Sequence, residues 1–410
     1  MGTNRLPLKG VRVLDFTWVI AGPTITKWLA AHGAEIVKVE SARDKTDVAR
    51  QDGGATAKGK TGGNLSGLFA NSNTDKLGIA LNMDRPEARS IARRLAAVSD
   101  VVLDNFTPGI MPRWGLDYES LRAINPQVIS ASMPGLGSSG PHAHYRGHGS
   151  FFMARTGLDE MVGYPHRETV DIGFAFPDAS CNPAHMTIAI LAALRHRNRT
   201  GQGQRIELRQ FESTINYLGV AALDFSANGR VQTRSGSRSP DAAPQGVYRC
   251  AGDDRWCAVT VASDTQWQAL CEAVGHPEMA ADPRFATLSG RKANEPVLDG
   301  MIDGWTSHRE AEDVMRLLQA AGVPAGVVQH AGDLMERDPQ MAHRQFYVEL
   351  EHPEIGPMRH EAFSFRLSAT PGRLGAPAPL LGQHTDFVLQ EILGLPESEV
   401  NEAIVNGAVL

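Results

Sequence analysis

A single carboxylate just ahead of a long helix is the first feature of this sequence that suits covalent chemistry. Asp178 lies in the segment FPDASCNPAHM, where Asn182 is a good N-cap residue and Pro183 suits the first helical position. The partial positive charge at a helix N-terminus favours a nearby anion. We therefore expect Asp178 to be ionised at neutral pH, as a carboxylate nucleophile must be. The alternative is an ordinary loop or capping residue, because Asp is common ahead of helices.

The helix after Asp178 has to hold this carboxylate in place. Gly201 can take the left-handed conformation that often ends a helix, so we expect the helix to end there. Four apolar residues recur at helical spacing, namely Met186, Ile190, Ala193 and Leu194. The other faces also carry apolar residues, namely Ile188, Ala189, Leu191 and Ala192. The pattern predicts a helix that is buried nearly all round.

Composition and charge exclude several classes of protein. The chain has 410 residues, more than one hydrophobic core usually serves, so we expect two domains. Its net charge of −6 and its lack of long basic runs argue against a nucleic-acid partner. No C-x-x-C pair occurs among the four cysteines, so neither a disulfide framework nor a metal site is indicated. Cys181 fits a buried thiol better than a nucleophile, because nothing beside it marks activation.

The N-terminal segment MGTNRLPLKG lacks the apolar core of a signal peptide. Apolar runs elsewhere are far shorter than the roughly 18 residues that a membrane span needs. We therefore expect a cytoplasmic protein without a membrane partner.

Alternating strand and helix patterns predict an α/β fold with a parallel, Rossmann-like sheet. The expected strands are residues 11–16, 34–40, 77–81, 100–103 and 128–132. The turn after the first strand contains Ala21-Gly22-Pro23 and no G-x-G-x-x-G, so we expect no NAD or FAD. Its backbone could still approach a ligand phosphate.

The pattern changes in the second half of the chain. Residues 226–246 are rich in Gly, Ser, Arg and Pro, which is typical of a linker, and residues 247–261 alternate like antiparallel strands. We predict a large domain whose N-terminal part is 1–225, a smaller α+β domain at 236–328, and a C-terminal part at 350–410. Residues 329–355 are interpreted as a second linker. An amphipathic helix is expected near the end, with the apolar residues Phe387, Leu389, Ile392 and Leu393.

Six separated segments resemble CoA-transferase family III, the group that contains formyl-CoA transferase, carnitine CoA-transferase and bile-acid CoA-transferase. They are GVRVLDFTWVIAGP, GAEIVKVE, DNFTPGIMPRWGLDYESLRAINPQVI, SASMPGLGSSGP, ILAALRHRNRTGQGQRIE and PLLGQHTDFVL. They follow the family order over nearly the whole chain. The resemblance implies a large Rossmann-like domain formed by both chain ends, an inserted smaller domain, and an interlocked homodimer.

The resemblance also implies that Asp178 is the catalytic nucleophile. A carboxylate attacks an acyl-CoA to give an aspartyl–acyl anhydride, and the released thiolate then forms an aspartyl-CoA thioester. A carboxylic acid acceptor reverses these steps. Acyl-CoA is then a substrate, and neither a metal nor a redox cofactor is needed. Backbone N–H groups of residues 135–140 could stabilise the oxyanions.

Family positions for CoA binding map onto nine residues, namely Ile20, Ala21, Arg43, Leu81, Asn82, Asn105, Phe106, Arg113 and Arg146. Arg113 and Arg146 suit phosphates, because guanidinium matches phosphate geometry. A surface ion pair is the alternative for Arg113, and core packing is the alternative for Phe106. Arg43 is included because Ser41 stands where relatives carry a phosphate-binding arginine.

Other departures argue against formyl-CoA:oxalate transfer. Asp84 stands where that enzyme has a nucleotide-binding lysine, and Gly149 stands where it has a glutamate. Its glycine-rich loop is also missing from residues 226–246. Bulky apolar residues favour an aromatic, steroid-like or branched acid instead, although the same residues could be core. They are Trp18, Phe151, Phe152 and Met153.

A competing interpretation is an α-methylacyl-CoA racemase, a relative on the same fold that uses His and Asp as paired bases. His148 in Gly147-His148-Gly149 keeps the histidine of that motif and loses the aspartate that follows it. Asp178 and His148 would then be the bases. Otherwise His148 is a loop histidine near the site.

Overall fold

The structure, a computed structural model, describes residues 6–41, 46–51 and 62–409, and its chain divides into two units. The first unit consists of Met1–Leu158, Asp171–Arg230 and His343–Leu410, so it contains both chain ends. The second consists of Asp159–Val170 and Val231–Ala342. It extends past both ends of the range 236–328 and includes residues 159–170 as well. The domain ranges drawn from the sequence stay a prediction.

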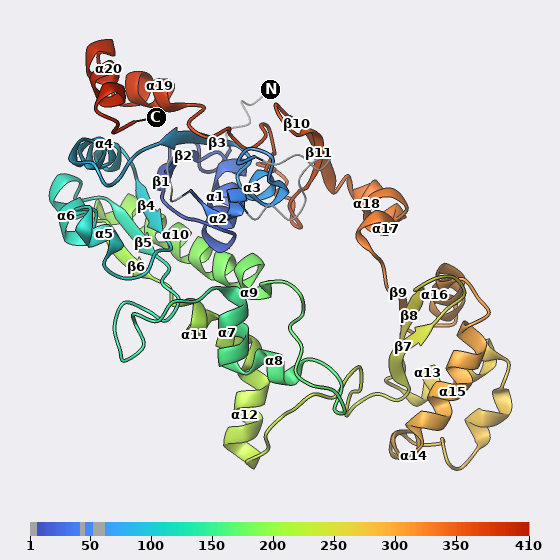
Figure 1. Ribbon diagram of the computed structural model, residues 1–410. Coiled ribbons are helices and arrows are strands. Elements are labelled where there is room, and N and C mark those ends of the chain that lie inside the picture. The colour runs from blue at the N-terminus through green and yellow to red at the C-terminus, as the bar shows by residue number, and fades with distance from the viewer. Residues whose placement is uncertain (1–5, 42–45, 52–61, 410) are drawn as a thin grey trace. The chain divides into compact units, whose positions relative to one another are not determined.

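A six-stranded parallel sheet organises the first unit, with the order β3–β2–β1–β4–β5–β6 (Figure 1). The strands are β1 (Arg12–Asp15), β2 (Glu35–Glu40), β3 (Lys76–Ala80), β4 (Val101–Asp104), β5 (Ile129–Ser132) and β6 (Gln204–Glu207). Doubly wound dinucleotide-binding folds share this order and bind ligands beyond the carboxyl ends of the strands, where the order reverses. That point lies here between β1 and β4. The mixed α/β class with a parallel sheet is confirmed, whereas the edge strand β6 was missed because its sequence QRIE is short and polar.

Helices cover this sheet on both faces. Those of the N-terminal half are α1 (Ala21–Ala31), α2 (Val48–Gln51), α3 (Gly67–Ser72), α4 (Pro86–Ala97), α5 (Ile110–Arg113), α6 (Tyr118–Ile124) and α7 (Gly149–Thr156). Those of the middle of the chain are α9 (Phe176–Ala179), α10 (Cys181–Thr200), α11 (Gln210–Ile215), the 3-10 turn η2 (Asn216–Leu218) and α12 (Gly219–Asn228). The short helix α8 (Leu158–Met161) spans a division between the units along the chain.

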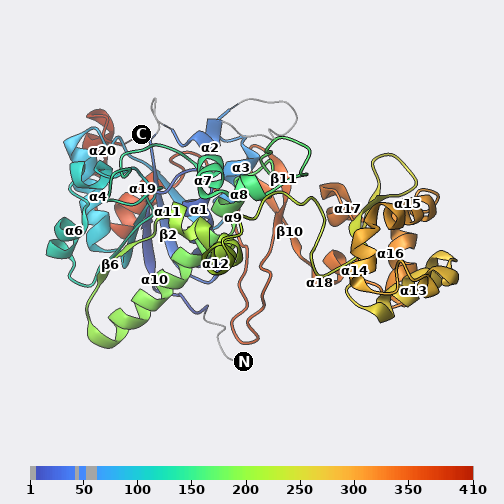
Figure 2. The ribbon, with the colours of Figure 1, turned by 90° about the horizontal axis from the view of Figure 1, so that it is seen from below.

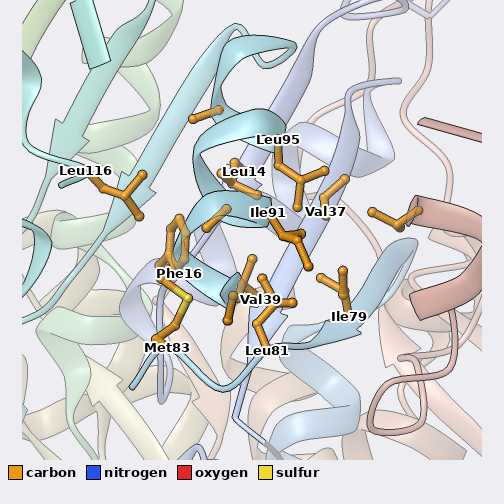
Figure 3. Close-up of a cluster of buried hydrophobic side chains, with 14 of the residues drawn as sticks. Leu14, Phe16, Val37, Val39, Ile79, Leu81, Met83, Ile91, Leu95 and Leu116 are labelled. Carbon is orange, nitrogen blue, oxygen red and sulfur yellow. The ribbon is translucent and has the colours of Figure 1, made fainter. Parts of the chain in front are cut away.

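The alternating side chains of the strands form two cores. On one face, Leu14, Val37 and Ile79 pack with Ile91 and Leu95 of α4 (Figure 3). The opposite face packs against α1 and α10 through strand residues that include Val13, Ile36, Val101 and Ile129. Burial on both faces is typical of parallel strands, and it fixes the register of the whole unit.

The long helix α10 is buried on one side only. Met186, Ile190, Ala193 and Leu194 are buried, as predicted. The prediction of burial all round was wrong, because Ile188 is 64% exposed and Leu191 is 42% exposed. The helix ends at Gly201 in the left-handed conformation, as expected.

The C-terminal segment returns to the first unit and completes its core. It forms α19 (Thr385–Phe387), a π-helical turn η4 (Val388–Ile392) and α20 (Glu397–Val405), which lie beside α4 in both views (Figures 1 and 2). Arg94 of α4 pairs with Glu399 of α20. The predicted apolar stripe is displaced, because Leu389 is buried while Phe387 is 49% exposed. The wider π-helical turn changes which side chains face inward, and Val388 lies in the core instead.

The second unit contains the predicted antiparallel strands, β7 (Gln245–Arg249), β8 (Trp256–Thr260) and β9 (Ala325–Val327). Its helical elements are α13 (Asp264–Val274), η3 (Pro277–Ala281), α14 (Leu288–Ala293), α15 (Glu295–Thr306), α16 (Ala311–Ala320) and α17 (Ala331–Glu336). The interpretation of residues 329–355 as a linker was wrong. They hold α17, α18 (Pro339–Arg344) and the strand β10 (Tyr347–His352), which pairs with β11 (Gly356–Glu361).

The described residues contain neither a membrane-spanning helix nor a cluster of metal ligands. No helix among them is long and apolar enough to cross a membrane. Within the same residues, no group of three or more His, Cys, Asp or Glu side chains is arranged to hold a metal ion. All four cysteines, Cys181, Cys250, Cys257 and Cys271, are free thiols in buried positions.

Candidate active site

Asp178 lies in α9, a single helical turn that runs directly into the long helix α10. Ser180 stands between the two helices as the N-cap position of α10. The predicted caps were wrong, because Asn182 and Pro183 both lie inside the first turn of α10 and are buried there. Asp178 therefore lies on a helical turn just before the break at Ser180, rather than in an open loop.

Two close neighbours shape the environment of the Asp178 carboxylate. The side chain is 6% exposed, and the Nδ2 of the fully buried Asn182 donates a hydrogen bond of 3.1 Å to Oδ1. Gly149, the first residue of α7, approaches from the other side. A Cβ added at Gly149 would lie 2.6 Å from Asp178 Oδ2 and 2.3 Å from Ala175 Cβ. Only glycine lets the backbone of α7 begin this close to the carboxylate.

Burial raises the pKa of Asp178 to about 6, although Asn182, the backbone of Gly149 and the charge of His148 act to lower it. With a pKa of about 6 the carboxylate is mostly ionised at neutral pH, and the groups that favour the ion include the backbone N–H at the start of α7. A carboxylate with a raised pKa is more basic and, in general, a better nucleophile.

His148 is the exposed residue before α7, at its N-cap position. It is near enough to Asp178 to affect the ionisation of the carboxylate. The structure thus brings together the two residues that the sequence named as candidate catalytic groups.

A cavity of about 460 Å³ lies at the carboxyl ends of β1, β2, β3 and β4, where the strand order reverses. Five of the predicted CoA-binding residues line it, namely Leu81, Asn82, Phe106, Arg113 and Arg146. Ser41 and Asp84, the two departures from the family pattern, line it too. An apolar cavity with a few converging polar groups is the usual form of a small-molecule site.

A chain of aromatic rings forms one wall of this cavity. Trp18 meets Phe106 edge-on at 5.4 Å between ring centroids, and Phe106 meets Trp114 at 5.6 Å. Trp114 continues to Phe16 at 6.1 Å. Such a wall can accept a flat base or an aliphatic arm. The sequence analysis missed Phe16 and Trp114, because the contact between them depends on how the sheet folds. The one available signal was the position of Trp114 next to Arg113.

Arg113 and Arg146 supply positive charge at the cavity. Both are exposed, and within the described part of the chain neither guanidinium has an ion-pair partner. This observation disfavours the surface ion pair considered for Arg113. Asp84 is also at the cavity and has an interaction of its own, so it is not available as a free carboxylate.

Three other predicted CoA-binding residues, Ile20, Ala21 and Asn105, do not line the cavity. Ile20 is the N-cap residue of α1, and Ala21 is buried in the core below it. The side-chain amide of Asn105 accepts a hydrogen bond of 2.9 Å from the Trp18 N–H and donates one of 2.8 Å to the Trp18 carbonyl. Arg43 lies outside the described residues.

The cavity and Asp178 are joined through one short segment. Arg146 and Gly147 line the cavity, and the chain passes from there through His148 to Gly149 beside Asp178. Two residues of extended chain span about 7 Å between Cα atoms. The edge of the cavity and the residue that contacts Asp178 are therefore only two residues apart in the chain.

The sequence matches the protein-family model for CoA-transferase family III over residues 8–385. The chain belongs to this family. It is 34% identical over 394 residues to a succinyl-CoA–D-citramalate CoA-transferase from Chloroflexus aurantiacus, covering 96% of each chain. It is also 31% identical to a succinate–glutarate CoA-transferase from Agrobacterium fabrum, covering 96% of this chain and 97% of that one.

A solved structure of similar fold is that of a CAIB/BAIF family protein from Brucella suis. It is 32% identical, with a TM-score of 0.85 over 94% of this chain and 99% of that chain. The resemblance to family III drawn from the sequence is therefore confirmed. As a CoA-transferase, the protein takes acyl-CoA as substrate.

Proposed function

We propose that the protein transfers CoA from an acyl-CoA to a carboxylic acid through covalent intermediates on Asp178. The observation that carries this proposal is the arrangement of Asp178: a buried carboxylate with a raised pKa, a single amide donor, and a glycine backbone beside its second oxygen. The segment that contacts it also borders a cavity with two arginines, Arg113 and Arg146, which have no ion-pair partner among the described residues. This combination suits a nucleophile that receives an acyl group from a long anionic donor.

The chemistry proceeds through two kinds of covalent intermediate, a mixed anhydride and an enzyme–CoA thioester. An oxygen of Asp178 attacks the acyl carbonyl carbon, and the carbon–sulfur bond breaks. CoA is released as its thiolate, and an aspartyl–acyl anhydride is formed. The thiolate attacks the aspartyl carbonyl and releases the donor acid, which leaves an aspartyl-CoA thioester. The acceptor carboxylate attacks the same carbonyl, and the released thiolate then takes the acceptor acyl group from the second anhydride. Each step exchanges one activated bond for another, so no ATP is consumed.

The backbone of Gly149 is our candidate donor to the developing oxyanion, because it already faces Asp178. The sequence analysis gave this role to residues 135–140. There the Gly135 backbone packs against the ring of Phe152, since an added Cβ would lie 2.3 Å from its Cζ. Asn182 would orient the nucleophile through its hydrogen bond to Oδ1.

We propose the cavity as the acyl-CoA site. Arg113 and Arg146 bind phosphate groups, while Trp18, Phe106 and Trp114 contact the base or the pantetheine arm. Leu81 and Asn82 complete the wall between β3 and α4. Arg43 stays a candidate for a further phosphate contact.

For the acid, we propose a short dicarboxylic acid with succinyl-CoA as a donor. The named relatives act on succinyl-CoA, citramalate and glutarate. The sequence favoured a bulkier acid because of apolar residues such as Phe152 and Met153. These are 1% and 0% exposed, which favours a packing role over a role in lining an acyl pocket.

The homodimer is also a proposal. Large apolar side chains are exposed on two helices of the first unit, namely Ile188 and Leu191 on α10 and Val220, Leu223 and Phe225 on α12. Exposed apolar surface of this extent usually marks an interface. A second copy of the chain would cover it, and the interlocked arrangement implied by the family predicts a dimer that does not dissociate on dilution.

Trapping the covalent intermediate tests the mechanism. Incubation with succinyl-CoA and then hydroxylamine should modify one peptide, the one that contains Asp178. The matched control is Asp104→Asn, which removes a second buried carboxylate, one whose pKa burial raises to about 7. Asp104→Asn should keep the modification and Asp178→Asn should abolish it. Modification of another peptide in wild type would refute the proposal, and exchange of the acyl α-hydrogen without modification would favour the racemase.

A further inference from the structure

The turn between β1 and α1 has an unfavourable backbone conformation. Val19 has φ of 68°, in the left-handed region that a β-branched residue rarely adopts. Strain of this kind persists only where surrounding groups enforce it, and it tends to occur at functional sites. The turn lies where the strand order reverses, and Trp18, the residue before Val19, lines the cavity.

Side chains from elsewhere in the fold bind the backbone of this turn. Asn105, just beyond β4, accepts a hydrogen bond of 2.9 Å from the Trp18 N–H and donates one of 2.8 Å to the Trp18 carbonyl. The Thr17 carbonyl accepts a hydrogen bond of 2.6 Å from Lys38 Nζ of β2. The Val19 N–H donates to Asp47 Oδ1 at 3.0 Å.

The charged side chains that bind the turn are fully buried. Lys38 and Asp47 are each 0% exposed, and their charged atoms lie 3.9 Å apart. On the next strands, Asp15 and Lys76 form a second buried pair at 3.4 Å. Asp15 also accepts a hydrogen bond from the Thr17 N–H at 2.8 Å. Buried ion pairs contribute little net stability compared with apolar residues of similar size. Their presence beneath one strained turn therefore points to a role in fixing its shape.

We propose that Asp47, Lys38 and Asn105 are positioning residues that preorganise the turn at residues 17–19 for acyl-CoA. None of the three lines the cavity, so they act through the backbone that carries Trp18. This inference rests on the proposed use of the cavity as the acyl-CoA site. It also changes the predicted role of Asn105 from a CoA ligand to a support for Trp18.

The consequence is a selective effect on binding. When a support is lost, Val19 relaxes out of its strained conformation, and binding must restore the ordered turn. Strain of the usual size corresponds to a weakening of roughly 10- to 100-fold. Asp178 and Asn182 belong to α9 and α10 and receive no bond from this network among the described residues, so the chemical step should change little.

The test compares Asp47→Ala and Asp47→Asn with Asp75→Ala. The Asn variant keeps an acceptor for the Val19 N–H and loses the charge, so it should lie between wild type and the Ala variant. Asp75 is a matched control because it also has positive φ, at 61°, and its Oδ1 accepts two backbone N–H groups, from Gly375 at 2.9 Å and Ala376 at 2.8 Å. It precedes β3, at the opposite end of the strand from the cavity.

We expect the KM for succinyl-CoA to rise about 10- to 100-fold in Asp47→Ala, with kcat within about 2-fold of wild type. Asn105→Ala should show the same split, and Asp75→Ala should leave KM unchanged. Titration calorimetry with CoA should show the same order of affinities. An unchanged KM in both Asp47→Ala and Asn105→Ala would overturn the inference. An equal rise in KM for Asp75→Ala would do so as well, because general destabilisation would then explain the effect.

Arg113→Ala separates this inference from the proposed function. If Arg113→Ala binds CoA as tightly as wild type, the cavity is not the acyl-CoA site and both proposals fail. If Arg113→Ala weakens binding while Asp47→Ala and Asn105→Ala do not, the site stands and only the positioning role is refuted.

Discussion

Two buried carboxylates of the same unit have opposite surroundings. Asp15 lies between lysines, and although burial acts to raise its pKa, Lys38, Lys76 and two threonine hydroxyls together hold it below the usual value. Asp178 has only the neutral amide of Asn182 as a side-chain hydrogen-bond partner among the described residues, and burial raises its pKa to about 6. A carboxylate balanced by cations is a poor base and a fixed structural anchor. One left without a bonded cation keeps its basicity for reaction.

The largest effect is predicted when each of the two carboxylates is replaced by its amide. Asp178→Asn should fold like wild type, since it keeps the shape of the side chain, and should lose transfer activity by at least ~1,000-fold, because every covalent step uses this carboxylate. Asp15→Asn should instead lower the free energy of unfolding by roughly 3–5 kcal/mol, because it leaves the buried Lys76 without its ion-pair partner. Urea unfolding and steady-state kinetics on both variants would measure the contrast. The comparison fails if Asp178→Asn is the less stable variant or keeps activity.

The sequence allowed Asp178 and the parallel sheet to be predicted, but not the neighbours that set the ionisation of each carboxylate. Asp178 could be found because a motif surrounds it, and the alternation of strand and helix segments along the chain predicted the parallel sheet. The neighbours that set its chemistry come from elsewhere in the fold. Gly149 is 29 residues away in sequence, and its contact with Asp178 exists only once α7 and α9 have packed. The ion network likewise requires β1, β2 and β3 to align, and no local pattern encodes that register.

The exposed half of α10 shows a different limit of sequence reasoning. Ile188 and Leu191 were predicted to be buried because apolar residues surround the helix axis. Periodicity reports which residues avoid water, but it does not distinguish a core of the same chain from the surface of a partner. The incorrect prediction and the proposed dimer thus have one physical origin.

The next largest effect concerns the approach of α7 to Asp178. In Gly149→Ala the new methyl group would lie 2.6 Å from Asp178 Oδ2 and 2.3 Å from Ala175 Cβ, so the backbone must move. We expect kcat/KM to fall by about 100-fold or more while the fold persists. Gly300→Ala in α15 is the control, since a Cβ there meets nothing within 4 Å. It should be neutral or slightly stabilising. Normal activity in Gly149→Ala would show that the contact does not constrain the nucleophile.

A smaller effect is predicted for the cations of the cavity. Arg113→Ala and Arg146→Ala should each lower kcat/KM for succinyl-CoA by ~10- to 100-fold, mainly through KM, because a charge-assisted phosphate contact contributes about 1.5–3 kcal/mol. The KM for the acceptor acid should change less. Arg122→Ala, on the exposed part of α6, provides a control that removes the same charge elsewhere. Equal kinetics in all three variants would remove the phosphate assignment.

The smallest predicted effect is on the pH dependence of kcat/KM, which reports the ionisation of Asp178. Because only the ionised carboxylate attacks, kcat/KM should fall about tenfold per pH unit below an apparent pKa near 6. An ordinary Asp would place this limit near 3.8. The raised pKa also means that the folded state binds more protons than the unfolded state between about pH 4 and 6. The contribution of Asp178 to stability should therefore decrease as pH rises through that window.

Asn182→Ala tests the cause of this ionisation. The Asn182 amide acts to lower the pKa of Asp178, so its removal should move the acid limb of the pH profile to higher pH, by on the order of one pH unit. Asn71→Ala is the matched control, because Asn71 Nδ2 donates to the carboxylate of Glu361 at 2.8 Å, on β11. It should leave the limb in place. A limb that stays near pH 6 in Asn182→Ala, or moves to lower pH, would show that another group controls the charge of Asp178. A limb near pH 4 in wild type would remove the contrast with Asp15 altogether.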